Sequence, residues 1–315
     1  MPNEKKSFRF DFKIESVNFD EKTDTFISII VPHPERYELR TVNGGKCYFD
    51  KFDEVFIPIE EIDKMLKWMQ NKQILSNPPK IKSGNAHIIG RMKYIKYYLD
   101  KQTENYSFSD KSEDFLSSLK KDKQRFVILS IDLKDSTELS QILSDELNAK
   151  IISLYIKEMI IIVDGFGGFV LKTDGDGLIA YFPEPNFIGM NDNAIDCAVT
   201  MKKMIVYAIN PILKKRDLPE LNFRIGLDSG EAIIKTLGVE NIKIHKDLIG
   251  ETVNKAAKIQ KLANSKQILM GESTVLNIHT FWRSKINIFN LPNDWKYKNK
   301  ETGELYPVYY LLESW

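Results

Sequence analysis

A carboxylate in a glycine-flanked turn is the first feature of this sequence that suggests chemistry. In the stretch FVLKTDGDGLIAYF, residues 169–182, two apolar runs meet at a turn that contains Asp174 and Asp176. Asp-Gly pairs are typical of β-hairpins, because glycine adopts the positive φ that such turns require. A hairpin alone explains the glycines, so a chemical role for Asp176 needs a partner elsewhere in the chain.

Asp132 is the candidate partner, because it ends the apolar run VILSI and precedes the segment LKDSTELS, where Ser136 or Thr137 can cap a helix. If this strand lies beside the hairpin, Asp132 and Asp176 converge next to a helix N-terminus. Such a pair can hold two Mg²⁺ ions, which complete their coordination with water and phosphate oxygens, and the helix start offers N–H groups to a polyphosphate. The inferred substrate is a nucleoside triphosphate.

Alternating strand and helix patterns surround these residues and predict an α+β fold. We expect a split-βαβ, ferredoxin-like arrangement with helices on one face of a mostly antiparallel sheet. The predicted elements are the strand RFVILSID, a mainly helical segment over 137–163, the hairpin, a helix over about 192–208, the strands NFRIGLDSG and EAIIKTLG, a helix over about 251–263, the strand KQILMG and a terminal pair ending in VYYLL.

The first third of the chain has a different character. Residues 8–59 read as short strands separated by turn signals, and Ile62, Leu66 and Met69 then recur at helical spacing. From Asp100 to Gln124 the chain is polar and charged. We therefore expect a small β-rich domain of unassigned, regulatory or partner-binding role over 1–115, a linker to about residue 124, and a second domain over 125–315.

Composition excludes several classes of function. Lys and Arg total 45 against 44 Asp and Glu, so no net field attracts the chain to nucleic acid or to an anionic membrane. Cys47 and Cys197 have no neighbour at metal-ligand spacing, which fits a reduced cytoplasmic setting. No run of eighteen apolar residues occurs, and we expect a soluble protein.

The motifs resemble the catalytic domain of the class III nucleotidyl cyclases, the adenylate and guanylate cyclases, over residues 125 to about 278 with an expected extension to 315. In that family the first metal-binding Asp follows a buried strand, as Asp132 does in ILSIDLKDSTELS, and the second lies in a Gly-Asp hairpin, as Asp176 does. The resemblance therefore implies metal binding by Asp132, Leu133 and Asp176, and phosphate contacts by Ser136 and Thr137. Its implied cofactors are two Mg²⁺ or Mn²⁺ ions per site.

Three further residues match the family in order, and a fourth position departs from it. Lys172 stands where the base-selecting lysine is found, four residues before Asp176, and Asp247 in HKDLIGETVNKAAK matches its partner, which accepts from the adenine amino group. Asn254 matches the ribose-orienting asparagine. Lys258 stands where the family has its transition-state arginine, so the charge is kept and the planar fork is lost.

The resemblance implies a head-to-tail homodimer with two shared sites. Asp132 and Asp176 of one chain would meet Lys172, Asp247, Asn254 and Lys258 of the other chain. The implied reaction converts ATP to 3′,5′-cyclic AMP and pyrophosphate by attack of the ribose 3′-oxygen on the α-phosphorus.

ATP is the expected substrate, because a lysine donates to adenine N1 while a carboxylate accepts from its amino group. Cytosine presents the same pattern, and the superfamily includes pyrimidine cyclases of bacterial antiphage defence, so cyclic CMP or cyclic UMP is an alternative product. A catalytically weak nucleotide-binding or dimerising module is another alternative. A diguanylate cyclase would show a Gly-Gly-Asp/Glu-Glu-Phe hairpin, which TDGDGLIA is not, and a polymerase palm lacks support from a basic groove.

Overall fold

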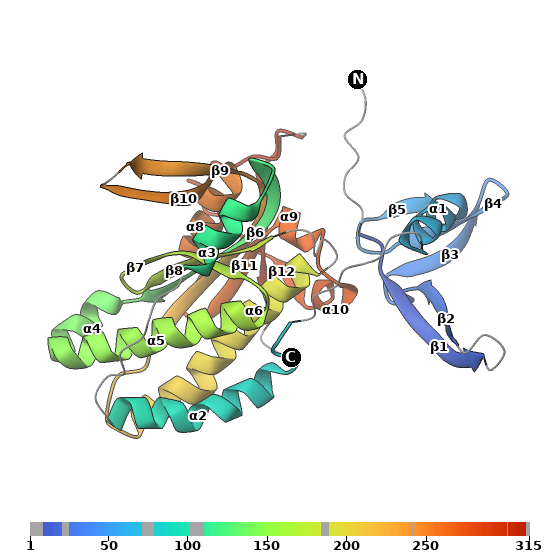
Figure 1. Ribbon diagram of the computed structural model, residues 1–315. Coiled ribbons are helices and arrows are strands. Elements are labelled where there is room, and N and C mark those ends of the chain that lie inside the picture. The colour runs from blue at the N-terminus through green and yellow to red at the C-terminus, as the bar shows by residue number, and fades with distance from the viewer. Residues whose placement is uncertain are drawn as a thin grey trace. The chain divides into compact units, whose positions relative to one another are not determined.

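The structure is a computed structural model that describes residues 9–20, 25–70, 79–100, 110–183, 189–240, 242–300 and 302–312 (Figure 1). Two compact units divide the chain between them. Unit 1 comprises Met1–Ser76 and the segment Leu276–Ile286, and unit 2 comprises Asn77–Val275 and Asn287–Trp315. The chain therefore leaves unit 2 for eleven residues and returns to it.

Unit 2 is built on an eight-stranded, mostly antiparallel sheet with the order β12-β13-β11-β9-β6-β8-β7, in which β10 also pairs with β9. The central strand β6 is flanked by β8 and β9, both antiparallel to it. This arrangement confirms the expected fold class. The strands are β6 Lys123–Lys134, β7 Phe169–Asp174, β8 Gly177–Pro183, β9 Asn222–Val239, β10 Lys243–Ile249, β11 Gln267–Gly271, β12 Ile286–Ile288 and β13 Val308–Leu311.

Strand β9 differs from the sequence expectation. The two expected strands NFRIGLDSG and EAIIKTLG form one continuous strand of 18 residues, and the segment that folds back on it as β10 was not predicted as a strand. Gly230 lies inside β9, where its missing side chain leaves room for helix α8 (Glu251–Leu262), because an added Cβ would lie 3.1 Å from Thr252 Cβ. The β9–β10 hairpin places Asp247 opposite Lys235.

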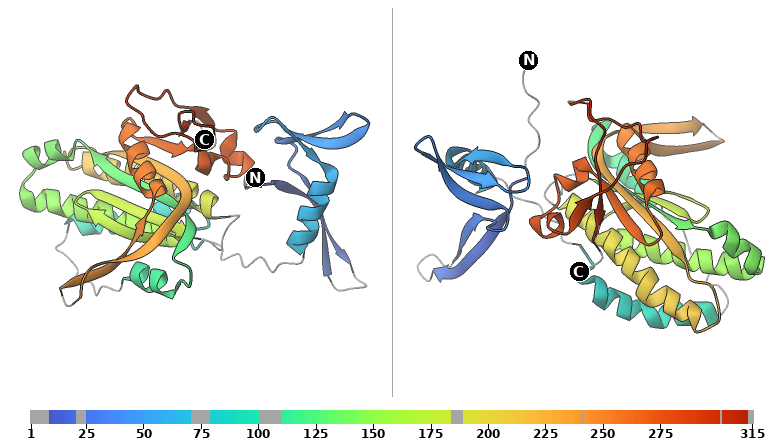
Figure 2. Two further views of the ribbon diagram at one scale, coloured as in Figure 1. Left: turned by 90° about the horizontal axis from the view of Figure 1, so that it is seen from above. Right: turned by 180° about the vertical axis from the view of Figure 1, so that it is seen from behind.

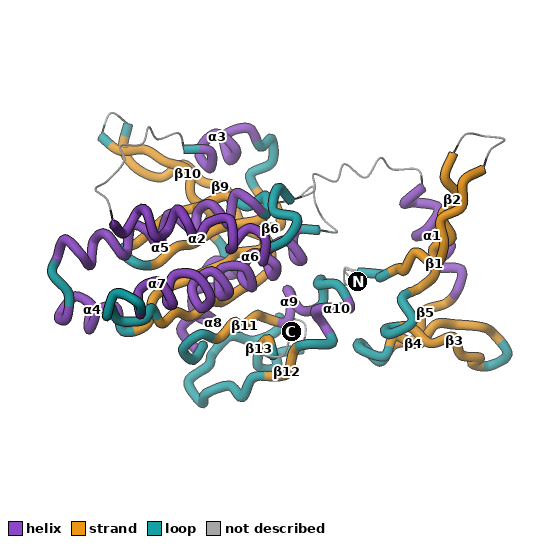
Figure 3. Tube along the Cα trace, turned by 90° about the horizontal axis from the view of Figure 1, so that it is seen from below, coloured by secondary structure: helices purple, strands orange, loops and turns teal. Residues whose placement is uncertain are grey.

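One face of the sheet is covered by long helices (Figure 3). Helices α2 (Gly84–Asp100), α5 (Asp145–Gly165) and α6 (Met190–Met204) pack on one another, and α5 and α6 contact strands of the sheet. The helix predicted over 192–208 is α6, continued by a π-helical turn Ile205–Ile209 and by α7 (Asn210–Lys214).

The opposite face carries helix α8 (Glu251–Leu262), so the expectation that helices lie on one face only is wrong. Successive residues of a strand point to opposite faces. On β9 the Ser229 hydroxyl bonds Asn191 of α6, whereas Gly226 lies against α8, where an added Cβ would clash with the Gln260 backbone nitrogen. Helix α8 can approach the sheet this closely only because Gly226 has no side chain.

Helix α2 belongs to unit 2 although the sequence suggested a boundary after it. Ile88, Ile95 and Tyr98 are buried, and the Arg91 guanidinium donates two hydrogen bonds, of 2.6 and 2.9 Å, to the fully buried Glu158 carboxylate of α5. The polar and aromatic residues of α2 hid this packing in the sequence, because its buried positions are few and widely spaced.

Unit 1 contains two small sheets (Figure 2). Its core includes the buried Arg36, which pairs with Asp11, Asp50 and Asp53. The segment 276–286 is tied in by Thr280, which donates to Asp11 at 2.7 and 2.9 Å. The elements are β1 Phe12–Asp20, β2 Thr25–Pro32, β3 Tyr37–Val42, β4 Gly45–Asp50, β5 Val55–Pro58, α1 Ile59–Gln70 and α10 Thr280–Arg283.

Among the described residues, no helix has both the length and the apolar character needed to cross a bilayer.

Candidate active site

Strand pairing brings the two carboxylates of the sequence analysis together. Ile131 of β6 is opposite Leu178 of β8, so Asp132 lies beside the turn that precedes β8. The chain reverses at Gly175, whose φ of +60° is a conformation that favours glycine, and Asp176 follows it. The Asp132 Oδ1 atom lies 3.3 Å from where a Cβ on Gly177 would stand. The Gly-Asp hairpin thus delivers Asp176 next to Asp132.

The two carboxylates share a negatively charged environment. Burial raises the pKa of Asp132, the nearby charge of Asp176 raises it further, and the Arg224 guanidinium opposes both effects. The Oδ2 atom of Asp176 is buried and has no hydrogen-bond partner among the described residues. A buried acceptor of this kind is destabilising unless a ligand satisfies it.

This arrangement fits a divalent cation. Asp132 and Asp176 supply hard oxygen donors, and a cation would both relieve their repulsion and satisfy Asp176 Oδ2. The Leu133 side chain is 2% exposed and apolar, so only its main-chain carbonyl can serve as a ligand. No group of three or more Asp, Glu, His or Cys side chains in the described part of the chain is arranged to hold a metal ion, so a cation held by Asp132 and Asp176 would also need water or substrate oxygens as ligands.

The helix after β6 begins one residue earlier than expected. Helix α4 (Ser136–Ile142) has Asp135 as its N-cap, with a left-handed φ of 64° and no side-chain capping bond. Ser136 and Thr137 are therefore the first two helical residues and not caps. Their backbone N–H groups belong to the first turn, whose donors have no intrahelical acceptor.

Arg224 and Tyr155 were missed in the sequence analysis. Arg224 of β9 is opposite Asp132, and its guanidinium donates to Asp132 Oδ2 at 3.3 Å. Tyr155 of α5 is fully buried, and its hydroxyl has no hydrogen-bond partner among the described residues. Burial and the charges of Asp132 and Asp176 raise the Tyr155 pKa well above its ordinary value. An arginine inside the apolar pattern NFRIGL is a sequence feature that could have indicated Arg224. Tyr155 has no such feature, because it resembles any aromatic core residue.

Lys172 and Asp247, 75 residues apart in sequence, meet in one chain. Lys172 on β7 donates to the Asp247 Oδ2 atom on β10 at 3.0 Å. The Lys172 side chain is 48% exposed and that of Asp247 is 13% exposed. Asp247 Oδ1 also accepts from the Leu248 backbone N–H at 2.8 Å, which fixes the carboxylate orientation. The pair presents a cationic donor and an anionic acceptor side by side.

Helix α8 separates its residues into two faces. Asn254 and Lys258 are one turn apart and exposed, and their side chains have no hydrogen-bond or ion-pair partner in the described part of the chain. Thr252 and Lys255 point the other way, toward the sheet. The first pair is thus available to a ligand, and the second pair holds the helix.

A buried polar cluster anchors that second face. Asp228 of β9 is fully buried and accepts from the Tyr306 hydroxyl at 2.7 Å and from Thr252 Oγ1 at 3.4 Å. The Lys255 ammonium lies 3.9 Å from the Tyr306 ring centroid. Burial raises the pKa of Asp228 to about 7, although Lys255 and the Tyr306 hydrogen bond lower it. An Asp inside the apolar pattern RIGLDSG is the one feature of the sequence that indicates this cluster.

Known proteins show the same domain. Residues 119–309, more than half of the chain, match the family described as adenylate and guanylate cyclase catalytic domain. The adenylate cyclase of Anabaena cylindrica is 27% identical over 164 residues, which is 49% of this chain and 31% of that enzyme. The uridylate cyclase of Burkholderia cepacia is 26% identical over 147 residues, which is 45% of this chain and 62% of that enzyme. The aligned region is thus less than two thirds of either relative.

Solved structures agree with this match at the level of the fold. The adenylyl cyclase CyaB from P. aeruginosa superposes with a TM-score of 0.52 at 19% identity, covering 61% of this chain and 96% of that chain. The guanylyl cyclase Cya2 superposes with a TM-score of 0.51 at 21% identity, covering 60% and 92%. The recognition made from Asp132, Asp176 and the motif around Asn254 is confirmed, and the chain belongs to the family of adenylate and guanylate cyclase catalytic domains.

Proposed function

We propose that this nucleotidyl cyclase converts ATP to 3′,5′-cyclic AMP and pyrophosphate. The observation that carries the proposal is the pairing of Lys172 with Asp247 at 3.0 Å. Adenine presents an acceptor at N1 and a donor at its amino group. An ammonium can only donate and a carboxylate can only accept, so the pair matches adenine, whereas guanine presents the reverse pattern.

Asp132, Asp176 and the Leu133 carbonyl are the proposed ligands of Mg²⁺ or Mn²⁺. Bound there, two such ions supply charge stabilisation for an attacking and a leaving oxygen. The raised pKa of Asp132 and the unsatisfied Asp176 Oδ2 support the assignment. Arg224 holds Asp132 in place, and the N–H groups of Ser136 and Thr137 are the proposed donors to the polyphosphate.

The chemical step is intramolecular. The ribose 3′-oxygen attacks the α-phosphorus, the bond to the bridging oxygen of pyrophosphate breaks, and the hydroxyl proton passes to solvent. Asn254 is proposed to orient the ribose and Lys258 to stabilise the negative charge that develops on the α-phosphate. Lysine presents a point charge where the family has a forked arginine, so we expect slower turnover from this position.

The proposed site is shared between two copies of the chain. Asn254 and Lys258 are exposed on α8, as is expected of residues that meet the ribose and α-phosphate of a nucleotide whose cations are held by a second copy. Asp132 and Asp176 of one protomer would face Lys172, Asp247, Asn254 and Lys258 of its partner in a head-to-tail homodimer. Under this proposal a monomer has no complete site.

A pyrimidine nucleotide is the second candidate substrate. Cytosine also pairs a ring-nitrogen acceptor with an amino donor, so Lys172 and Asp247 match CTP in a smaller pocket. The relative from Burkholderia cepacia is named a uridylate cyclase, which supports a pyrimidine nucleoside triphosphate as the second candidate. Cyclic CMP or cyclic UMP would then be the product.

The test is a product assay with the full chain. The purified protein is incubated with Mn²⁺ and, separately, with ATP, GTP, CTP and UTP, and any cyclic product is identified by mass. Cyclic AMP as the main product is expected. A cyclic pyrimidine would move the substrate to the second candidate, and no product from any of the four, with triphosphate still bound, would favour a nucleotide-binding module.

A further inference from the structure

Helix α3 (Lys111–Ser118), which precedes the sheet of unit 2, contacts both strands that carry the Lys172–Asp247 pair, namely β7 and β10 (Figure 1). Its N-terminus is fixed by Asp110, whose carboxylate accepts from the backbone N–H groups of Ser112 and Glu113 at 3.0 Å each. A capped first turn holds the side chains that follow it in defined positions.

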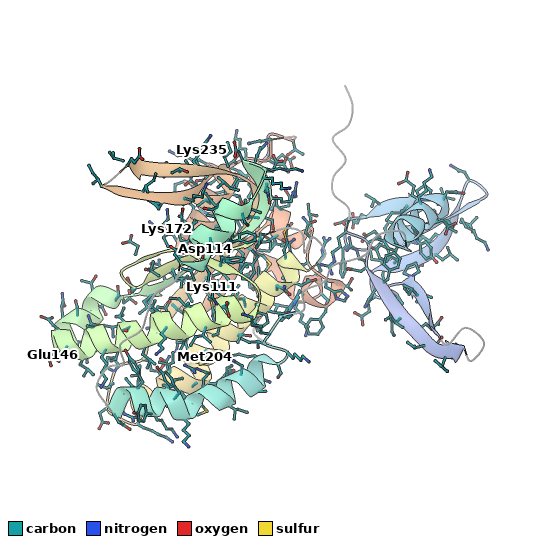
Figure 4. The ribbon with its side chains drawn as sticks, in the orientation of Figure 1. Lys111, Asp114, Glu146, Lys172, Met204 and Lys235 are labelled. Atoms are coloured by element: carbon teal, nitrogen blue, oxygen red, sulfur yellow. The ribbon has the colours of Figure 1, made fainter. Side chains whose placement is uncertain are left out.

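Toward β7, the helix packs through aromatic and apolar contacts. Phe115 stacks on Phe169 with ring centroids 4.3 Å apart, and Leu116 is 1% exposed in the same cluster. Ser112 Oγ lies 3.1 Å from the hydroxyl of Tyr181 on the neighbouring strand β8. Phe169 is three residues before Lys172 on β7, so these contacts fix the strand from which Lys172 extends. Figure 4 labels Lys172 of β7 and Asp114 of α3.

Toward β10, the helix makes a hydrogen bond through a carboxylate, and Leu116 shares its buried apolar cluster with Leu248 of β10. The Glu113 Oε2 atom accepts from the Lys246 backbone N–H at 2.7 Å. Strand β10 pairs with β9 alone among the described strands, so Glu113 satisfies a donor that the sheet leaves open. Lys246 is directly followed by Asp247. A short hydrogen bond to a carboxylate is among the stronger kinds in proteins.

We propose that Glu113 is a specificity-determining positioning residue: it holds Asp247 at the distance from Lys172 at which the two side chains read one base edge. The inference rests on the proposed function and adds a residue outside the motifs that carry it. Glu113 does not touch the substrate and acts through the Lys246 backbone. Loss of this contact lets β10 move relative to β7, and the acceptor at Asp247 then no longer matches the donor at Lys172.

Three variants test this role. Glu113→Ala removes the acceptor, Glu113→Gln keeps an acceptor oxygen without the charge, and Asp114→Ala is the matched control, because Asp114 is an exposed carboxylate on the same helix. The measured quantity is the ratio of kcat/KM for an amino-bearing base to that for its keto counterpart, ATP against GTP or CTP against UTP. We expect Glu113→Ala to reduce the ratio on the order of tenfold, Glu113→Gln to reduce it less, and Asp114→Ala to leave it unchanged.

Two further measurements keep the outcomes separate. Hydrogen exchange at the Lys246 amide is expected to accelerate on the order of tenfold in Glu113→Ala and not in Asp114→Ala. The ratio of the equilibrium binding constants for the two triphosphates compares the two bases without turnover. If the wild-type chain is inactive, the proposed function is contradicted, and the binding ratio still tests the role of Glu113. An unchanged ratio in Glu113→Ala, or an equal loss for both bases, would show that the contact is structural only and overturn the inference.

Discussion

At the scale of single residues, Asp176 has an environment that folding alone does not explain. Its Oδ2 atom is buried with no partner among the described residues, and its charge raises the pKa of Asp132. Both features oppose stability, whereas the turn needs only Gly175 for its backbone conformation. Residues that bear such a cost are typical of functional sites.

Replacement of Asp176 separates function from folding. Asp176→Asn is expected to lower turnover by about 100-fold or more, because it removes a charged ligand from the proposed cation site. The melting temperature should change by less than about 2 °C, because the substitution also removes repulsion with Asp132. Product formation and thermal denaturation are measured on the same preparation, with and without Mn²⁺.

Asp174 supplies the control for this prediction. It is an exposed carboxylate two residues earlier in the same hairpin, so Asp174→Asn makes the same change of charge outside the proposed site. We expect Mn²⁺ to raise the melting temperature of the wild type and of Asp174→Asn, but not of Asp176→Asn. Equal turnover in all three proteins would return the hairpin to a purely structural role.

At the scale of elements, the sequence predicted those parts of the site that depend on local patterns. The β6 strand and the Gly-Asp hairpin are evident from apolar runs and turn residues, and the motif around Asn254 lies on the expected helix. The partners Arg224, Tyr155 and Tyr306 could not be predicted. Arg224 is 92 residues from Asp132 and Tyr306 is 78 residues from Asp228, whereas Tyr155 lies on α5, so only the tertiary fold brings each residue beside the group that it influences. Interactions between charged groups on different elements depend on the tertiary arrangement of those elements, which local sequence patterns do not specify.

Helix α8 depends on such a tertiary contact, and this gives a pH prediction. The pKa of Asp228 is raised by burial to about 7, above the ordinary 3.8, so the folded state retains a proton that the unfolded chain releases. The contribution of this group to the free energy of unfolding is therefore complete below about pH 4 and is lost as pH rises through about 7. Lys255 and Tyr306 are the titratable groups that face it.

Asp228→Asn removes this titration. We expect the fall in melting temperature between pH 5 and pH 8 to be smaller in Asp228→Asn than in the wild type, as measured by thermal denaturation across that range. Asp294→Asn is the control, because Asp294 is exposed and the substitution makes the same change of charge. If the melting temperature of both variants depends on pH as that of the wild type does, Asp228 stays ionised beneath α8 and the prediction is wrong.

At the scale of the whole molecule, the division of the chain constrains what can be removed from it. Segment 276–286 lies between two parts of unit 2 in sequence but packs in unit 1, where Arg283 donates to Asp53 at 2.8 Å. A truncation at residue 115 would also remove α2 and its buried Ile95 from unit 2. The polar composition of residues 100–124 suggested a boundary there, because composition does not reveal which helix packs on which sheet.

Mixing two inactive variants tests the proposed shared site. Asp176→Asn damages the cation side of a site and Asn254→Ala damages the ribose side. If each site takes these residues from different protomers, a mixed dimer has one site with both defects and one site with none. Random pairing at equal amounts makes half of the dimers mixed, each with one of two sites intact, so the mixture should recover about a quarter of wild-type turnover.

The control pairs two variants on the same side of the site. Asp132→Asn and Asp176→Asn each damage the carboxylates that one protomer contributes to one site, so every site in their mixed dimer carries a defect, and no recovery is expected. Recovery is measured as cyclic nucleotide formed after the two proteins are mixed and allowed to exchange subunits. The proposed division keeps Asp132 with Asp176 on one protomer and places Asn254 on the other, so it predicts recovery by the first mixture alone. Recovery by both mixtures, or by neither despite confirmed exchange, would contradict a site divided in this way.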